Sequence, residues 1–150
     1  VEEKYPVFAI KDPYHFEKYD TPASKAFAAW AWVQMFFNYF LLVYFFAYIA
    51  KIGSPNIFIY GGFVFLSIYA FTELMDRHRY AMYIEIIKSG IGLYLIYSMG
   101  DWFGASNTAV PWFTYVVAIY LVISAIITSL FSIIEIGKNE KARKPELSVA

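Results

Sequence analysis

The sequence predicts an all-α integral membrane protein whose four transmembrane helices form an antiparallel bundle. Hydrophobic residues make up 60% of the 150 residues and charged residues only 16%, a composition typical of membrane proteins. Four long apolar stretches follow one another, with short polar segments between them. The length allows one domain. We therefore expect a transmembrane domain over residues 25–136, a polar N-terminal tail over 1–24 that contains prolines and aromatic residues, and a polar C-terminal tail over 137–150.

The first expected helix covers about residues 25–51. Its apolar stretch from Ala26 to Ala50 can cross roughly 30 Å of hydrocarbon at ~1.5 Å per residue. Gln34 and Asn38 are four positions apart, so they share one face of the helix. Because polar groups in lipid need hydrogen-bond partners, we expect this face to point into the bundle.

The second expected helix covers about residues 56–76 and the third about 79–99. The connection between them is so short that the two helices must form an antiparallel hairpin. On the second helix, Gly62, Ala70 and Glu73 share a face. We expect this face to approach a neighbouring helix closely, and the charge of Glu73 then lies on the same side of the helix.

The two faces of the third expected helix differ in character. One face contains small and charged residues and is expected to pack inside the bundle: Ala81, Glu85, Lys88, Ser89, Gly92 and Ile96. The opposite face is expected to meet lipid or a groove, and its members include Tyr83, Tyr94 and Tyr97.

The fourth expected helix covers about residues 111–136. Pro111 falls in its first turn, where a missing N–H leaves no hydrogen bond unmade. The polar residues of this helix follow one helical stripe: Ser124, Thr128, Ser132 and Glu135. In the polar connection before it and at its start, Trp102 and Trp112 are expected to anchor one membrane interface.

The distribution of basic residues predicts the orientation in the membrane. Four spans would place both termini on one side. That side would carry ten basic residues: Lys4, Lys11, Lys18, Lys25, Arg77, Arg79, Lys138, Lys141, Arg143 and Lys144. The other side would carry only Lys51. By the positive-inside rule both termini are expected to be cytoplasmic, and the expected location is a bacterial inner membrane.

The densest charge in the chain lies between residues 72 and 88, and it defines the candidate site. We expect an ion-pair network at the cytoplasmic end of the bundle, formed by Glu73, Asp76, Arg77, Arg79, Glu85, Lys88 and Glu135. Interhelical hydrogen bonds are expected from Gln34, Asn38, Ser124 and Thr128. A charge at the bilayer centre costs roughly 2.5–3.5 kcal/mol on insertion scales, so these charges need partners.

Three interpretations of the network remain open. It can fix helix register, it can form the polar floor of a lipid-headgroup pocket, or it can transfer protons or ions. No acidic residue, basic residue or histidine lies in the outer half of the four apolar stretches, which argues against a relay across the membrane.

Composition excludes several kinds of site. The chain has no cysteine, so disulfides, thiolate chemistry and cysteine-ligated metals are excluded. It has only two histidines, His15 in the N-terminal tail and His78 in the hairpin connection, and these cannot hold a metal cluster. We therefore expect no metal site and no catalytic residue. The formal net charge is zero and no nucleic-acid signature is present.

Two segments carry a resemblance to a known family. They are the stretch Phe16-Glu-Lys-Tyr-Asp-Thr-Pro22 before an aromatic helix with Gln34, and the pattern Leu74-x-Asp76-x-x-x-Tyr80-Ala81-x-x-x-Glu85-x-x-Lys88 between two apolar helices. Together they resemble the C-terminal helical region of the alkylglycerol-monooxygenase-like branch of the sterol desaturase and fatty acid hydroxylase superfamily. The histidine-rich di-iron part of that family has no counterpart here. The resemblance therefore implies a non-catalytic helical module.

The expected function is that of an integral membrane accessory subunit or module, which packs against lipids and a larger membrane protein. The resemblance suggests a di-iron lipid hydroxylase as that partner. Two alternatives stay open. The chain could bind or modify an ether lipid, sterol or fatty acid in a pocket near Glu85. It could also be a small subunit of a bioenergetic or photosynthetic complex. No cofactor is expected within the chain itself, but lipid, quinone or pigment could contact its aromatic surface.

Overall fold

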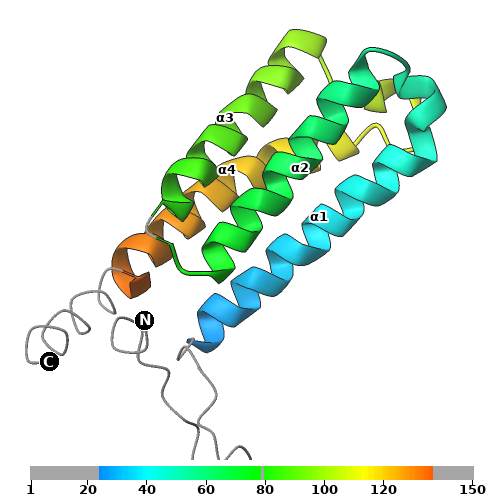
Figure 1. Cartoon of the computed structure of the whole chain (residues 1–150). Helices are drawn as coiled ribbons and strands as arrows, with labels where there is room; N and C mark the ends of the chain where they lie inside the picture. Colours follow the sequence, from blue (N-terminus) through cyan, green and yellow to red (C-terminus); the bar gives the residue numbers. More distant parts are fainter. Residues whose placement is uncertain (1–23, 79, 137–150) are drawn as a thin grey trace, which may run out of the picture.

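The computed structural model of the chain describes residues 24–78 and 80–136, and within these ranges it is all-helical, as the sequence predicts. Four α-helices form a bundle (Figure 1): α1 (Lys25–Ile52), α2 (Asn56–Met75), α3 (Ala81–Met99) and α4 (Phe113–Phe131). A 3-10 turn, η1 (Ala105–Asn107), lies in the connection before α4, and a π-helical turn, η2 (Ser132–Ile136), extends α4.

Local chemistry at the helix ends explains their bounds. Ser24 caps α1, because its hydroxyl oxygen accepts the N–H of Phe27 at 3.1 Å. Gly100 ends α3 in the left-handed conformation (φ +81°), which glycine adopts without steric cost. At the start of α4, residues 111–112 form a turn, so the α-helix begins at Phe113.

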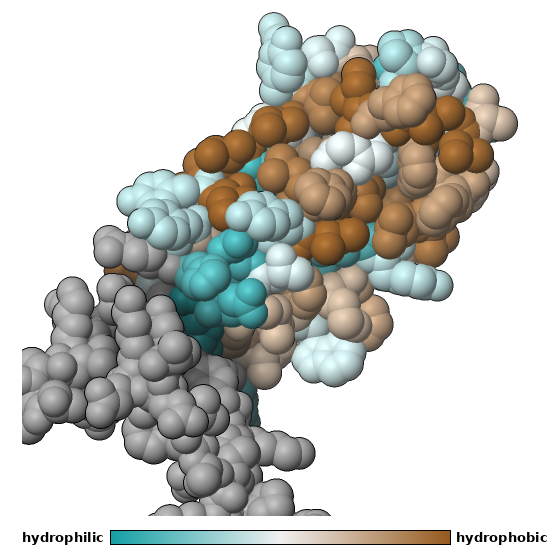
Figure 2. Space-filling model, viewed as in Figure 1, coloured by the Kyte–Doolittle hydropathy of each residue, from teal (hydrophilic) through white to brown (hydrophobic). Residues whose placement is uncertain are grey.

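The helices pack in sequence order, α1 on α2, α2 on α3 and α3 on α4. Figure 1 shows the start of α1, the turn between α2 and α3 and the end of α4 at one end of the bundle. Helices α1, α2 and α4 are long and apolar enough to cross a membrane. Figure 2 shows a mainly hydrophobic face along the helices, with hydrophilic residues gathered near the α2–α3 turn.

The buried face of α2 agrees with the expected one at Ala70 but differs at Gly62. Gly62 is exposed, and a methyl group at this position would meet nothing within 4 Å. The helix instead buries the side chains of Tyr60, Phe63, Val64, Ser67, Ala70 and Leu74. Because lipid is as apolar as these side chains, packing and hydrogen bonds decide which face is buried. Tyr60 and Phe63 both pack against Trp102, and the Tyr60 hydroxyl also hydrogen-bonds Leu41 O.

Helix α3 has the two faces that the sequence predicts. Ala81, Glu85, Lys88, Ser89 and Gly92 are buried, and Tyr83, Tyr94 and Tyr97 are exposed. At Gly92 the neighbouring helices come close, since a methyl group there would lie 2.5 Å from Leu121 Cδ1 and 3.0 Å from Phe63 Cε2. The small face of α3 therefore allows α2 and α4 to pack on it tightly.

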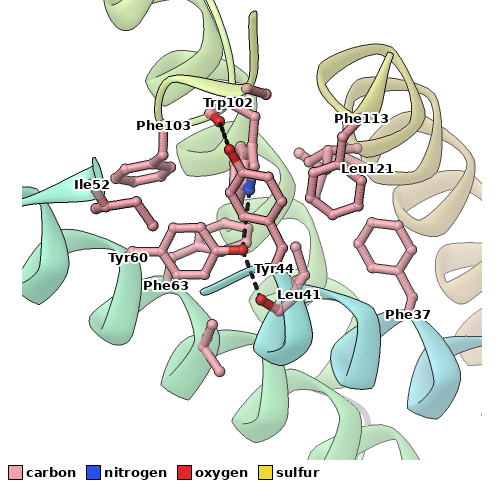
Figure 3. Close-up of a cluster of buried hydrophobic side chains, with 13 residues drawn as sticks. Phe37, Leu41, Tyr44, Ile52, Tyr60, Phe63, Trp102, Phe103, Phe113 and Leu121 are labelled. Carbon is pink, nitrogen blue, oxygen red and sulfur yellow. Dashed lines mark hydrogen bonds between the residues drawn. The ribbon is translucent and has the colours of Figure 1, made fainter. Parts of the chain in front are cut away.

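An aromatic cluster fills the end of the bundle opposite the α2–α3 turn (Figure 3). Trp102 was expected at the membrane interface but is fully buried in this cluster, packed against Phe63 with ring centroids 5.0 Å apart. Its indole Nε1 donates a hydrogen bond to the Tyr60 hydroxyl at 3.2 Å. This buried partner replaces the water that an interfacial tryptophan would use. Trp112, in contrast, is 57% exposed.

Hydrogen bonds to backbone carbonyls fix the same cluster. The Tyr60 hydroxyl donates to Leu41 O at 2.9 Å, and the Tyr44 hydroxyl donates to Trp102 O at 3.3 Å. The Tyr44 ring stacks on Phe113 with centroids 4.6 Å apart. The connection before α4 is thereby held inside the bundle by α1 and α2.

Asp101 orders the connection between α3 and α4. Its carboxylate accepts hydrogen bonds from the Gly104 N–H at 2.8 Å, the Ser106 N–H at 3.1 Å and the Ser106 hydroxyl. Burial alone would raise the pKa of Asp101, but the Ser106 hydroxyl and the two backbone N–H groups outweigh this effect, so its pKa is lowered. The ionised form of Asp101 therefore stabilises this turn.

Candidate functional site

The charged residues with the deepest burial are Glu85 and Lys88, one turn apart on α3. Lys88 Nζ lies 2.5 Å from Glu85 Oε1, and their side chains are 3% and 0% exposed. A buried charge is tolerated only when an opposite charge and hydrogen bonds compensate it. The pair brings opposite charges together and is enclosed by neighbouring helices.

Hydrogen bonds connect this pair to the other side of the bundle. The Ser124 hydroxyl of α4 donates to Glu85 Oε1, and Gln34 Nε2 of α1 lies 3.4 Å from Ser124 Oγ. Gln34 Nε2 also donates to Thr128 Oγ1 at 2.9 Å, and Trp30 Nε1 donates to the same oxygen at 3.1 Å. Side chains from α1, α4 and α3 thus form one buried polar chain.

Aromatic rings surround the pair on the α4 side. Lys88 Nζ lies 5.4 Å from the centroid of the Tyr120 ring, within the range of a cation–π contact. The Tyr120 ring is stacked on Phe37 of α1. The ammonium group is therefore held between a carboxylate and an aromatic face.

This arrangement favours a structural role for Glu85 and Lys88. A general acid or base has to come within hydrogen-bond reach of its substrate. Both side chains are instead enclosed by protein, because the Glu85 side chain is 0% exposed and the Lys88 side chain is 3% exposed. In this conformation the pair contacts helices and does not contact lipid at the surface of the bundle.

A hydrogen bond between a histidine and a carboxylate lies at the α2–α3 turn. His78 Nδ1 is 2.6 Å from Glu73 Oε2, and because an ionised carboxylate only accepts, the imidazole donates. The His78 side chain is 58% exposed and that of Glu73 is 16% exposed. The sequence places His78 in the hairpin connection but did not predict its contact with Glu73. The five-residue spacing across a helix end is the signal that could have suggested it.

The remaining residues of the expected network have separate positions. Asp76 is exposed, and the Arg77 guanidinium lies 5.1 Å from the Phe27 ring centroid. Arg79 and the side chain of Glu135 lie outside the described residues. A single network that joins all seven residues thus stays a prediction. Asn38 is buried at 8% exposure on the same face as Gln34.

Within residues 24–78 and 80–136, no group of three or more histidine, cysteine, aspartate or glutamate side chains could hold a metal ion. No protein-family model, curated protein or solved structure matches the chain.

Proposed function

We propose that this chain is a membrane-embedded, non-catalytic helical module that packs against lipids and a larger membrane protein. The observation that carries the proposal is that the charged side chains within α3 are buried, whereas the outer surface of the bundle is apolar. Glu85 and Lys88 are sealed inside the bundle, whereas large apolar side chains such as Phe46, Phe58 and Phe65 are 67–76% exposed. Exposed apolar area of this extent needs lipid or protein to cover it.

The proposal includes a fourth span, α3, between α2 and α4. The two charges that reduce the apolar character of α3 face inward. Among its exposed residues, Ile87 and Ile91 lie near the middle of the helix, and Tyr83 and Tyr97 lie toward its two ends. These tyrosines are fourteen positions apart, about 21 Å along a helix. Tyrosine at both ends of an apolar stretch is typical of membrane interfaces.

Four spans would place both termini on one side, which the excess of lysine and arginine identifies as cytoplasmic. Lys51, at the far end of α1, would then be the exception on the outer side. The location that we propose is a bacterial inner membrane.

The proposed partner follows from the resemblance to the C-terminal helices of the alkylglycerol-monooxygenase-like branch. A membrane protein with a histidine-rich di-iron centre would supply the chemistry, and the present module would supply a packed helical surface next to it. A bioenergetic or photosynthetic assembly is the other partner class that such an aromatic surface could serve.

Topology can be tested by labelling introduced cysteines, because the chain contains none of its own. Asp76→Cys lies in the α2–α3 turn and Asn107→Cys in the connection before α4, and both positions are exposed. In intact cells, an impermeant maleimide should label Asn107→Cys and leave Asp76→Cys unlabelled until the membrane is opened. Labelling of both positions from outside would contradict the four-span topology.

The partner can be tested by affinity purification in mild detergent followed by native mass spectrometry. We expect a stoichiometric complex with a larger membrane protein, and its histidine content will distinguish the two partner classes. A monodisperse chain that retains lipid but no protein would instead support a lipid-binding function. A monodisperse chain with neither would contradict the proposal.

A further inference from the structure

The strongest unexplained feature is a set of buried oxygen atoms at the contact between α2 and α3. Ser67 of α2 is 2% exposed, Ser89 of α3 is 3% exposed and Glu85 is fully buried. Ser67 Oγ, Ser89 Oγ and Glu85 Oε2 have no hydrogen-bond partner among the described residues. An unsatisfied buried polar atom costs about 1–3 kcal/mol, so three on the two adjacent helices α2 and α3 call for an explanation.

The register of the hairpin places the two serines at the same level. Phe63 lies opposite Gly92, because a methyl group at Gly92 would contact the Phe63 ring at 3.0 Å. One helical turn from this contact toward the α2–α3 turn, Ser67 follows Phe63 and Ser89 precedes Gly92. Since the helices are antiparallel, these steps run in the same direction, and Ser67 faces Ser89 across the contact.

The contacts of Lys88 show which side of Glu85 the serines occupy. Lys88 lies against the Tyr120 ring of α4, and Glu85 Oε1 receives the Ser124 hydroxyl of α4. Ser89 is rotated about 100° from Lys88 around the axis of α3 and is buried, so it lies on the α2 side. Glu85 Oε1 binds groups on the α4 side, and Oε2 of the same carboxylate has no partner among the described residues, so it is available to a group on the α2 side.

We infer that Ser67, Ser89 and Glu85 Oε2 bind an ordered water molecule between α2 and α3. Buried water typically makes about three hydrogen bonds to such groups. The water would donate one hydrogen bond to Glu85 Oε2 and one to a serine hydroxyl oxygen, and it would accept one from the other serine. A metal cation does not fit as well, because Lys88 already neutralises Glu85 and a further positive charge would be uncompensated.

This water site gives the Glu85 carboxylate a hydrogen bond on each oxygen and joins α2 to the polar chain of α1, α4 and α3. It depends only on the packing of α2 against α3. A failed search for a partner membrane protein would therefore leave it unaffected.

The test is a crystal structure of the full chain in a lipidic mesophase, at a resolution that orders internal water. We expect a solvent peak about 2.6–3.2 Å from all three oxygens. The inference is overturned if both serine hydroxyls bond to carbonyls of their own helices, or directly to Glu85, and no peak lies between them.

Thermal unfolding of variants gives a second, independent readout. Ser67→Ala combined with Ser89→Ala should remove the peak and lower the melting temperature of the purified protein. Ser98→Ala is the matched control on α3, because the exposed Ser98 hydroxyl donates to Leu95 O at 3.1 Å in its own helix. A double variant whose melting temperature equals that of the Ser98→Ala control would overturn the inference. If the double variant does not fold, the map of the unmodified protein decides.

Discussion

Lys88 and Glu85 form an ion pair with an Nζ–Oε1 distance of 2.5 Å, and neither side chain reaches the surface of the bundle. Their mutual dependence can be measured with a double-mutant cycle. Glu85→Gln keeps a hydrogen-bond acceptor for Ser124 but strands the Lys88 charge, and Lys88→Met strands the Glu85 charge. We expect each single change to lower the free energy of unfolding by about 3–5 kcal/mol.

The double variant, Glu85→Gln with Lys88→Met, carries no buried charge. It should lose much less stability than the sum of the two single changes. Lys51→Met serves as an exposed control, with an expected effect of about 0–1 kcal/mol. Unfolding in mixed micelles would measure the stability of these four variants and of the unmodified protein, and additive effects of the Glu85 and Lys88 changes would show that the pair is solvated.

Two glycines on α3 should respond in opposite ways to the same substitution. Gly92→Ala places a methyl group 2.5 Å from Leu121 Cδ1, and such overpacking costs about 1–3 kcal/mol. Gly90→Ala meets nothing within 4 Å and should gain up to about 1 kcal/mol from helix propensity. Melting temperatures of both variants in one detergent would test this, and a stabilised Gly92→Ala would show that α2 and α4 give way easily.

The periodicity of small and polar residues predicted most of the bundle. The stripe on α3 with Glu85, Lys88 and Gly92 is buried, and so are Gln34 on α1 and Ser124 and Thr128 on α4. These residues carry a strong signal because polar groups within an apolar helix have few alternatives to an inward position. The ion pair of Glu85 with Lys88 follows from their three-residue spacing on that stripe.

The predictions that were wrong concern residues whose tertiary contacts are not specified by the local sequence pattern. Ala70 of the expected packing face on α2 is buried, but Gly62 is exposed, because the contacts of Tyr60 and Phe63 orient this helix. Trp102 looked like an interfacial anchor, and only the position of the Tyr60 hydroxyl in the folded chain shows that its indole has a buried partner. Neither outcome depends on residues that are close in sequence.

The Tyr60 hydroxyl links three segments, and its removal should be costly. Tyr60→Phe would leave Trp102 Nε1 without its acceptor and would remove the side-chain donor that Leu41 O receives in addition to its helical N–H. We expect a loss of about 1–3 kcal/mol, the usual effect of an unsatisfied buried group. Tyr97→Phe is the matched control, since Tyr97 is 86% exposed, and it should change stability very little. Equal stability of the two variants would mean that water replaces the lost hydroxyl.

Acid should weaken the connection between α3 and α4 through Asp101. Burial raises the pKa of this carboxyl, but hydrogen bonds from the Ser106 hydroxyl and the Gly104 and Ser106 N–H groups lower it further than burial raises it. A lowered folded-state pKa means that Asp101 adds stability above its unfolded pKa of about 3.9. That contribution is lost as the pH falls from there through the folded-state pKa.

Melting temperatures of the unmodified protein should therefore decline below about pH 4, and part of that decline should disappear in Asp101→Asn. The amide cannot ionise, and one of its two acceptor oxygens is replaced by a donor that repels the Ser106 N–H. Asp101→Asn should accordingly be less stable than the unmodified protein at neutral pH, and the two proteins should converge as acid is added. Curves that stay parallel over this range would show that the carboxylate contributes nothing to the folded connection.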